Sequence, residues 1–472
     1  MTSVAARRPV VNVDQPGRPA SRSRRTLWNI AATTVIWGTS LFVVALWVAG
    51  AGIQSLLGFD AETLNTLGRL TGLVSANLLL YQVLLMARVP LFERGFGRDD
   101  ITRMHRFVGF WSFWLLMAHI VLLVLGYAAQ AAVNPLVQLW QFVWDYPGML
   151  LATAATGLLI MVVVTSIRRS RRRLRYESWH LLHLYAYLGV GLAIPHMLWT
   201  GADFVQNPGA TVYWWTLWAV AAASVLVFRI GQPLWRSLRH GMRVVSVVPD
   251  GRNGVSVRMR GRDLQRLNAR AGQFFVWRFL DGPGWTRGHP YSLASAPIGD
   301  DLVISAKIVG DGTDRLTRLR PGTRALIEGP YGTMTGDVRE ARKLLMIGAG
   351  AGVAPLTALL AAEDYRRGEA VLLTRDHSDA DGMRLDEISR LTTTRGLRHF
   401  TLNGPRDKSR ATWLPASHHA WTGAALLRRL APDIENYDVF LCGPNPWMDA
   451  VHADLRKAGV PERRIHSEAF AV

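Results

Sequence analysis

Residues 105–119 read HRFVGFWSFWLLMAH, and residues 183–196 read HLYAYLGVGLAIPH. Both stretches are apolar enough to lie in a bilayer, yet each begins and ends with a histidine. An ionisable side chain inside a membrane is costly and therefore indicates a functional site. Because neutral imidazole is a common metal ligand, the two stretches predict metal centres held between two membrane helices.

The apolar residues of the chain are concentrated in its first half. Six runs approach the roughly 20 apolar residues that a membrane helix needs. They cover residues 28–51, 70–87, 107–126, 149–167, 181–198 and 212–230. No such run follows residue 243. The 472 residues have room for about three domains, so we predict a six-helix membrane domain at 27–234 and a soluble remainder.

The basic charge of the chain follows the same division. A net charge of +19 and a pI near 10.9 would suggest nucleic-acid binding in a soluble protein. Here Lys and Arg avoid the connections 52–68, 127–147 and 200–211 and gather in the other connections and the tail. By the positive-inside rule both termini and the soluble half are cytoplasmic, at the plasma membrane. We expect a lipid bilayer and no nucleic acid as partner.

Residues 1–26 form a basic tail that is rich in Arg, Pro and Ser, and we predict that it is disordered. The apolar run after it is longer than the core of a signal peptide, and we interpret it as a retained first helix. The one cysteine, Cys442, excludes an intramolecular disulfide and suits a reducing compartment.

The four histidines that bound the two quoted stretches form two levels. With a cytoplasmic N-terminus the third and fifth helices run in the same direction, so His105 and His183 lie near the inner face. His119 and His196 then lie nearer the outside. A rise of 1.5 Å per residue separates the two levels by roughly 20 Å, which leaves room for two stacked haems. Two imidazoles on one haem favour electron transfer over gas binding at the iron.

The spacing of the second pair requires an irregular helix. Fourteen residues return close to the same helix face, whereas thirteen residues rotate the second histidine by about 140°. Pro195 removes a backbone donor and can reset the register, so we predict an irregular fifth helix. His180, one turn before His183, is an alternative inner ligand. Any single histidine could instead satisfy hydrogen bonds in the helix core.

Six spans with H-x13-H in the third and H-x12-H in the fifth resemble the ferric reductase and NADPH oxidase superfamily. The resemblance covers nearly the whole chain after the tail. It implies that His105 and His183 hold an inner haem b, and that His119 and His196 hold an outer one.

From about residue 242 the pattern changes to short strands with Gly and Pro turns, which predicts a small antiparallel barrel. A motif similar to the flavin site of ferredoxin–NADP reductases, in the form of the NADPH oxidase branch, consists of His289, Pro290, Tyr291 and Ser292. The resemblance implies an FAD-binding barrel at 238–337. The Tyr291 ring would lie against the flavin, and the Ser292 hydroxyl would lie near its reactive nitrogen.

Many of these reductases have Arg where this chain has His289, which leaves the flavin pyrophosphate without its usual partner. A segment similar to the second phosphate-binding segment of the family is the expected substitute. It consists of Lys307, Gly310, Gly312 and Thr313.

A glycine-rich loop lies between an apolar strand at 343–347 and an apolar helix at 356–362. This context lets backbone amides and a helix N-terminus approach a pyrophosphate. The candidate residues of this loop are Gly348, Gly350, Gly352 and Pro355. We therefore predict an NAD(P)H-binding α/β domain at 338–472. Arg375 and Arg406 resemble contacts to an adenosine 2′-phosphate, which favours NADPH over NADH.

The last candidate residues lie near the end of the chain. Cys442, Gly443 and Pro444 match the family's motif at the nicotinamide, and Glu468 and Phe470 match its C-terminal pattern. The resemblance implies that the terminal aromatic covers the flavin and that the acid supports hydride transfer. The candidate catalytic residues are thus Ser292, Cys442, Glu468 and Phe470.

We therefore expect electrons to pass from cytosolic NADPH through FAD and two haems to an acceptor outside. The expected acceptor is oxygen, which would give superoxide, and the alternative acceptor is a ferric chelate. A hypothesis of another class is a haem-binding membrane anchor with an inert reductase half. We expect no obligatory protein partner.

Overall fold

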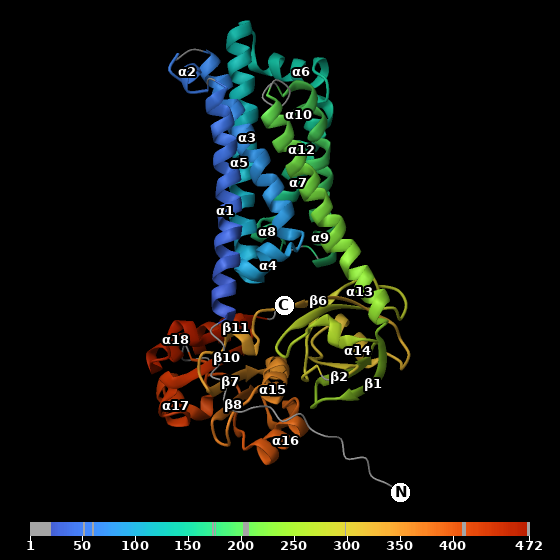
Figure 1. The fold of residues 1–472 in the computed structure, drawn as a ribbon, viewed down its shortest axis with the longest axis vertical. Coiled ribbons are helices and arrows are strands. Elements are labelled where there is room, and N and C mark those ends of the chain that lie inside the picture. The colour runs from blue at the N-terminus through green and yellow to red at the C-terminus, as the bar shows by residue number, and fades with distance from the viewer. Residues whose placement is uncertain are drawn as a thin grey trace. The chain divides into compact units, whose positions relative to one another are not determined.

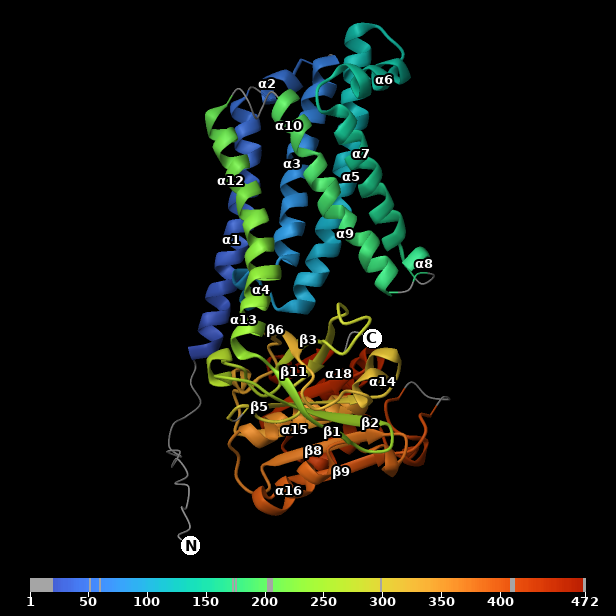
Figure 2. The ribbon, with the colours of Figure 1, turned by 90° about the vertical axis from the view of Figure 1, so that its right-hand side faces the viewer.

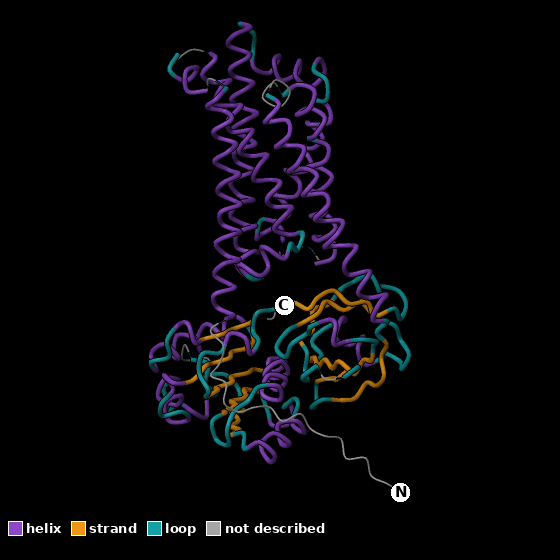
Figure 3. Tube along the Cα trace, viewed as in Figure 1, coloured by secondary structure: helices purple, strands orange, loops and turns teal. Residues whose placement is uncertain are grey.

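The computed structural model describes residues 20–50, 52–58, 61–171, 174, 176–201, 207–297, 299–407 and 412–469. The chain divides into two compact units, Arg25–Gly231 and a second unit that begins at Gln232. Helices make up the first unit, whereas strands and helices alternate in the second (Figure 3).

The first unit is a bundle of long helices that run alongside one another (Figures 1 and 2). Its helices are α1 (Ala20–Ala49), α2 (Gly52–Leu56), α3 (Ala61–Met86), α4 (Pro90–Phe96), α5 (Arg98–Ala131), α6 (Pro135–Asp145), α7 (Met149–Ser166), α8 (Arg168–Arg171), α9 (Tyr176–Leu192), α10 (Ile194–Thr200), α12 (Pro208–Ser224) and the π-helix η1 (Val225–Gly231). Among the described residues, six helical stretches are long and apolar enough to cross a membrane. This confirms the predicted number of spans.

Small residues bring α3 and α5 close together. A Cβ atom on Gly68 of α3 would lie 2.7 Å from the Leu123 side chain of α5. The Ser75 hydroxyl donates a hydrogen bond of 2.7 Å to the main-chain oxygen of Ser112 across the same interface. In membrane proteins, close packing of small residues and interhelical hydrogen bonds hold helices together. The two helices therefore form a fixed frame for any ligand between them.

The fifth span is broken at one residue, as its histidine spacing requires. Helix α9 ends at Leu192, and α10 begins at Ile194 with Pro195 in its first turn. A Cβ atom on Gly148, which has a φ of 79°, would lie 2.8 Å from the backbone nitrogen of His196. The predicted irregularity is confirmed, and the glycine makes room for the displaced backbone.

The second unit begins with α13 (Gln232–His240) and a β-barrel-like pair of antiparallel sheets. One sheet has the order β1-β2-β5, with bounds Arg243–Pro249, Gly254–Arg260 and Asp301–Lys307. The other has the order β4-β3-β6, with bounds His289–Ser292, Phe274–Phe279 and Ala325–Tyr331. Large apolar side chains, among them Phe275, Trp277 and Ile304, fill the space between the sheets. Helix α14 (Asp311–Thr317) follows β5.

A parallel sheet of order β11-β10-β7-β8-β9 forms the rest of this unit. Its strands are β7 (Lys343–Ala349), β8 (Ala370–Asp376), β9 (Arg398–Asn403), β10 (Tyr437–Gly443) and β11 (Ile465–Ala469). Its helices are α15 (Val353–Ala362), α16 (Leu385–Arg395), α17 (Gly423–Leu430) and α18 (Asn445–Ala458). Short 3-10 turns are η2 (Leu264–Leu267), η3 (Gly336–Val338), η4 (Gly350–Gly352), η5 (Asp379–Asp381), η6 (Ala416–His418), η7 (Ile434–Asn436) and η8 (Glu462–Arg464). The strand order reverses between β7 and β10, so ligands are expected at their carboxyl ends.

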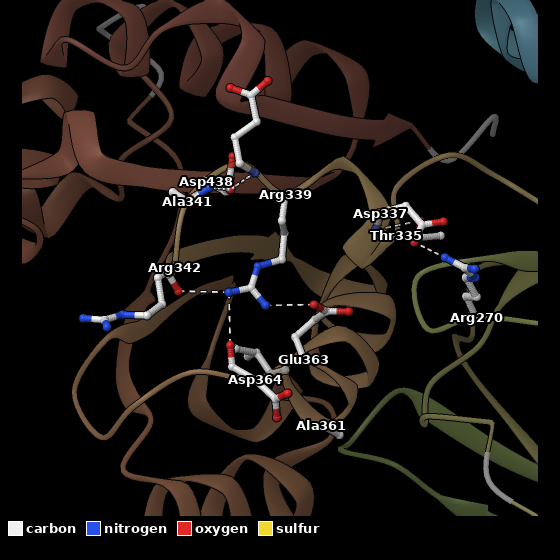
Figure 4. A network of polar contacts seen from close by, with 12 residues as sticks. Arg270, Thr335, Asp337, Arg339, Ala341, Arg342, Ala361, Glu363, Asp364 and Asp438 are labelled. Atoms are coloured by element: carbon white, nitrogen blue, oxygen red, sulfur yellow. Dashed lines mark hydrogen bonds and ion pairs between the residues drawn. The ribbon is translucent and has the colours of Figure 1, made fainter. Parts of the chain in front are cut away.

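A polar network fixes the connection between the barrel and the parallel sheet (Figure 4). The Arg339 guanidinium donates a hydrogen bond of 2.8 Å to the Glu363 carboxylate. It also donates hydrogen bonds of 3.0 Å to the main-chain oxygens of Arg342 and Asp364. Arg270 of the barrel forms an ion pair with Asp337 in the same connection. Arg339 thus fastens the connection to the parallel-sheet half, and the Arg270–Asp337 ion pair joins the same connection to the barrel.

Candidate functional site

The structure brings His105 of α5 and His183 of α9 together. Their ring centres lie 6.0 Å apart, and their planes are inclined by 67°. The Nδ1 atom of His105 is buried and has no hydrogen-bond partner among the described residues. The Nδ1 atom of His183 lies 3.2 Å from the Ser166 hydroxyl of α7. The ring contact of His105 is with His183, which favours His183 over His180 as its partner.

His119 and His196 are held by main-chain carbonyls. The Nδ1 atom of His119 lies 2.7 Å from the oxygen of Gly68, and that of His196 lies 2.7 Å from the oxygen of Ala193. Because a carbonyl only accepts, each ring donates its Nδ1 proton and keeps a lone pair on Nε2. This is how metal-binding histidines are usually oriented. The two rings also lie close enough to interact electrostatically.

The helix α3 leaves room for the His119 ring. A Cβ atom on Gly72 would lie 2.7 Å from Cε1 of His119, which is too close for any other residue without movement. The glycine therefore fixes how near the ring can come to α3.

Arg69 is a charged residue near the outer histidines that the sequence analysis did not single out. It follows Gly68 directly and forms an ion pair with Glu62, whose carboxylate also accepts a hydrogen bond of 3.0 Å from Gln130. The Arg69 side chain is 38% exposed. In the structure it lies within the membrane-spanning helix Glu62–Met86, whereas the apolar run predicted from the sequence begins one residue later, at residue 70.

In the barrel, the flavin motif contacts the first turn of α14. The Tyr291 hydroxyl donates a hydrogen bond of 3.2 Å to the main-chain oxygen of Gly312. The Tyr291 ring stacks on the His289 ring, and the two ring centres lie 6.2 Å apart. A Cβ atom on Gly312 would lie 2.6 Å from Cε1 of His289. Burial raises the pKa of Tyr291, so its hydroxyl stays protonated. Strand β4 and the turn therefore form one surface, although they are distant in sequence.

Other candidates of the barrel shape this surface. The Thr313 hydroxyl accepts hydrogen bonds from the backbone nitrogens of Val309, at 2.9 Å, and Gly310, at 3.2 Å, and so closes the turn. Ser292 is buried at the end of β4, and Pro290 is exposed beside it.

The structure places Lys307 beside the glycine loop of the parallel sheet. Its Cδ atom lies 3.8 Å from where a Cβ atom of Gly350 would be. It also interacts electrostatically with Asp376 and Asp381. A flexible cation next to this loop suits a phosphate there, whereas the sequence analysis grouped Lys307 with the flavin turn.

The glycine loop itself lies at the carboxyl end of β7. Gly350 has a φ of 53°, and a Cβ atom on Gly352 would lie 2.6 Å from the carbonyl carbon of Cys442. A Cβ atom on Gly348 would press on Leu356 of α15 at 3.0 Å. Helix α15 begins directly after the loop, with Pro355 buried in its first turn. The loop amides and the helix N-terminus therefore face the region where the strand order reverses.

Cys442 and Glu468 meet at the neighbouring strand ends. The Cys442 thiol donates a hydrogen bond of 3.3 Å to the main-chain oxygen of Glu468. Burial of the thiol raises its pKa, and the nearby Glu468 carboxylate raises it further. A Cβ atom on Gly332 of the barrel would lie 2.8 Å from the Glu468 carboxylate. Gly443 packs on Trp447, and Pro444 precedes α18. Phe470 lies outside the described residues.

The two candidate arginines for a 2′-phosphate differ in their surroundings. Arg375 donates hydrogen bonds to the main-chain oxygens of Leu402, at 3.2 Å, of Gly404, at 2.8 Å, and of Asp376. Its burial lowers the pKa of its guanidinium. Arg406 is exposed at the end of the chain segment that follows β9. Arg375 thus caps two strand ends, and only Arg406 is exposed to solvent.

The carboxylate beside Arg375 is unusual. Asp376 is 6% exposed, and its Oδ1 atom has no hydrogen-bond partner among the described residues. Burial raises its pKa to about 6, although the positive charge of Lys307 partly opposes this. No cluster of three or more His, Cys, Asp or Glu that could hold a metal ion exists within the described ranges.

Known proteins match the two halves of the chain separately. Residues 71–194 match the family described as ferric reductase like transmembrane component. The ferredoxin reductase component of a 3-ketosteroid-9-alpha-monooxygenase from Rhodococcus rhodochrous is 29% identical over 205 residues, 43% of this chain and 56% of that protein. The heavy chain of a superoxide-generating NADPH oxidase from Dictyostelium discoideum is 25% identical over 248 residues, 46% of this chain and 45% of that one.

The structure of a cytochrome P450 reductase from Amycolatopsis is similar to 49% of this chain and 69% of that chain, with 24% identity and a TM-score of 0.40. The chain spans about half the length of the two curated relatives named above.

The chain is thus similar to the ferric reductase like transmembrane component in its first half and to an NADPH oxidase heavy chain. It is a multi-pass membrane oxidoreductase whose second half is a ferredoxin reductase-like module, and this module supports flavin and nicotinamide cofactors. The resemblance, the fold class and the enzyme class predicted from the sequence are confirmed.

Proposed function

We propose that this chain carries electrons from cytosolic NADPH across the plasma membrane to oxygen, giving superoxide outside. When bound, NADPH supplies a hydride, FAD couples two-electron to one-electron transfer, and two haems b carry single electrons. The termini and the reductase half lie in the cytoplasm, in accord with the positive-inside rule. Relatives named as reductase components serve multi-component systems, whereas here we propose that the first acceptor of the reductase half lies in the same chain.

The observation that carries the proposal is the separation of His105 and His183. Imidazole nitrogens bind transition metals at about 2 Å, so two imidazoles on one ion have ring centres roughly 6 Å apart. The observed separation is 6.0 Å. The inner pair would therefore hold one iron without moving apart.

The outer pair fits the same role through its tautomers. His119 and His196 each direct a lone pair on Nε2 away from the carbonyl that accepts the Nδ1 proton. His119 and His196 would hold the iron of the outer haem through these lone pairs, and that haem would supply single-electron transfer.

Separate groups of residues in the reductase half would bind the flavin, the nucleotide phosphates and the nicotinamide. Tyr291, His289 and the turn at Gly312 would hold FAD, while the glycine loop and Lys307 would hold the nucleotide phosphates. Cys442 and Glu468 lie where the nicotinamide would meet the flavin. The protonated thiol and the adjacent acid would orient the nicotinamide, and Ser292 would donate a hydrogen bond to the flavin.

The alternative acceptor is a ferric chelate. The exposed Arg69, next to the main-chain partner of His119, favours it because an arginine attracts anionic chelates. The ion pair with Glu62 opposes this attraction by neutralising the charge.

Purified protein in detergent tests the cofactors, by pyridine haemochrome and flavin quantitation. We expect two haems and one FAD per chain. NADPH-driven cytochrome c reduction that superoxide dismutase abolishes would support oxygen as the acceptor. A dismutase-insensitive signal with rapid ferric-chelate reduction under nitrogen would make the protein a ferric reductase. Failure to consume NADPH with any acceptor would favour the inert haem-binding anchor.

A further inference from the structure

The short helix α13 (Gln232–His240) has one face that is fastened to the barrel. The Ser237 hydroxyl donates a hydrogen bond of 3.1 Å to the main-chain oxygen of Ile327 in β6. It also accepts a hydrogen bond of 2.9 Å from the main-chain nitrogen of Ile327. The Nδ1 atom of His240 donates a hydrogen bond of 2.8 Å to the main-chain oxygen of Arg262. Both side chains are buried. These bonds engage main-chain groups, so the helix is an integral part of the barrel.

The opposite face of α13 is apolar and exposed. Leu234, Trp235 and Leu238 are 52%, 57% and 66% exposed. Their spacing of one and four residues puts them on one side of the helix. The guanidinium of Arg239 lies 5.2 Å from the centre of the Trp235 ring. A contiguous apolar face with an aromatic and a cation at its border is typical of a helix that lies on a membrane surface.

The length of the preceding span indicates where this face lies. The apolar stretch Pro208–His240 has 33 residues, or about 50 Å of helix, whereas the hydrocarbon core of a bilayer is about 30 Å thick. Its first charged residue, Arg229, lies within the π-helix η1, where the regular helix is interrupted. Helix α13 therefore follows the point at which the chain leaves the hydrocarbon core.

We propose that α13 is an interfacial helix whose partner is the lipid surface itself. Leu234, Trp235 and Leu238 insert among the headgroups of the leaflet at which this span ends, while Ser237 and His240 hold the barrel. Tryptophan is enriched at this depth of membranes, and Arg229 favours anionic headgroups. The helix thus ties the flavin barrel to the bilayer. The inference requires only that α12 spans the membrane, not that the proposed electron transfer occurs.

The full chain in nanodiscs of phosphatidylcholine and phosphatidylglycerol tests the proposal. A nitroxide is attached at Leu238→Cys, and the matched control is Val248→Cys on β1, where the side chain is 50% exposed. Cys442 stays in place because it is 1% exposed, and protein without an added cysteine gives the labelling background. We expect the label at 238 to collide more with oxygen, which dissolves in lipid, than with a water-soluble nickel chelate. The control should show the reverse ratio.

Two results would overturn the proposal. A label at 238 that resembles the one at 248 would mean that the face meets water. Low collision rates with both reagents at 238 would mean that protein, such as a second copy of this chain, covers it. Trp235→Cys lies on the same face and gives the same test if Leu238→Cys does not assemble.

Discussion

His119 and Gly68 are joined by a hydrogen bond of 2.7 Å, from the Nδ1 atom of the ring to the main-chain oxygen of the glycine. The close packing of α3 against α5 thereby determines the tautomer of a candidate ligand. The carbonyl of Gly68 is accessible to the ring because Gly72, one turn later, has no side chain. Helix packing and ligand orientation are therefore coupled, and each can be altered through the other.

Removing an outer histidine should remove one haem only. We expect His119→Ala and His196→Ala each to lose one of two haems and to stop electron flow to external acceptors. Flavin reduction by NADPH should remain, because these residues are in the first unit and the candidate flavin residues are in the second. Haemochrome assays and stopped-flow flavin absorbance measure both effects. The control is His180→Ala, which should keep both haems; normal haem content in both outer variants would refute the assignment.

A single added methyl group should disturb the outer site. In Gly72→Ala the new Cβ atom would lie 2.7 Å from Cε1 of His119, so the ring must move or tilt. We expect a shifted low-spin haem signal in the electron paramagnetic resonance spectrum, or partial loss of the outer haem. Gly157→Ala on α7 is a matched control, since nothing lies within 4 Å of its Cβ position. Identical spectra in the wild type and in both variants would mean that His119 is not a haem ligand.

The sequence was sufficient to predict the six spans and to select four histidines as candidate ligands. An ionisable residue in an apolar run is visible locally, so His105 and His119 could be recognised without knowing any contact. The glycine loop and the flavin motif are also local patterns, and the structure joins each to the predicted kind of strand.

Side-chain direction was not predictable in the same way, because it depends on distant backbone. Arg375 is turned toward carbonyls of a neighbouring strand and its following turn, up to 29 residues away. Lys307 reaches the glycine loop of another sheet, and the tautomer of His119 depends on a carbonyl 51 residues earlier. Arginine is abundant in this chain, and Arg69 stands just before the apolar run at 70–87, so no sequence pattern distinguished it.

Replacing Arg375 and replacing Arg406 should have different effects on nucleotide binding and on thermal stability. Arg406→Ala should raise the KM for NADPH roughly tenfold or more, as expected for a lost charge-assisted hydrogen bond, and change that for NADH little. Arg375→Ala should also lower thermal stability, because three main-chain oxygens lose their donor. Steady-state kinetics with both nucleotides and thermal unfolding separate the effects. If Arg406→Ala keeps the wild-type nucleotide preference, the phosphate site lies elsewhere.

The connection between the barrel and the parallel sheet should depend on Arg339. Its partners are Glu363 and two main-chain oxygens, and its side chain is largely buried. We expect Arg339→Ala to cost about 1–3 kcal/mol, because its side chain is only 14% exposed and three acceptors lose their donor. Arg342→Ala is the control, since its side chain is 55% exposed and its ion pair with Glu369 contributes about 0–1 kcal/mol. Equal losses of thermal stability in the two variants would contradict this ranking.

Asp376 should make the stability of the parallel sheet depend on pH. Burial raises its pKa from 3.8 to about 6, so between these values the native state binds more protons than the unfolded state. Stability therefore falls as the pH rises through this window, and the cost of the buried carboxylate is complete above about pH 6. Asp376→Asn removes that cost and should stabilise the protein by roughly 1–2 kcal/mol at pH 7.5, allowing for partial screening, but hardly at pH 4.

Asp301 should make stability depend on pH in the opposite direction, because its pKa is lowered, mainly by the hydrogen bonds it accepts from Arg260. Its stabilising effect is complete above its unfolded pKa and is lost as the pH falls through the lower native value. Asp301→Asn should therefore lower the unfolding temperature at pH 7.5, where Asp376→Asn raises it. Unfolding temperatures of both variants and the wild type at pH 4 and 7.5 provide the measurement. An Asp376→Asn variant that is less stable than wild type at pH 7.5 would show that its carboxylate has a favourable partner.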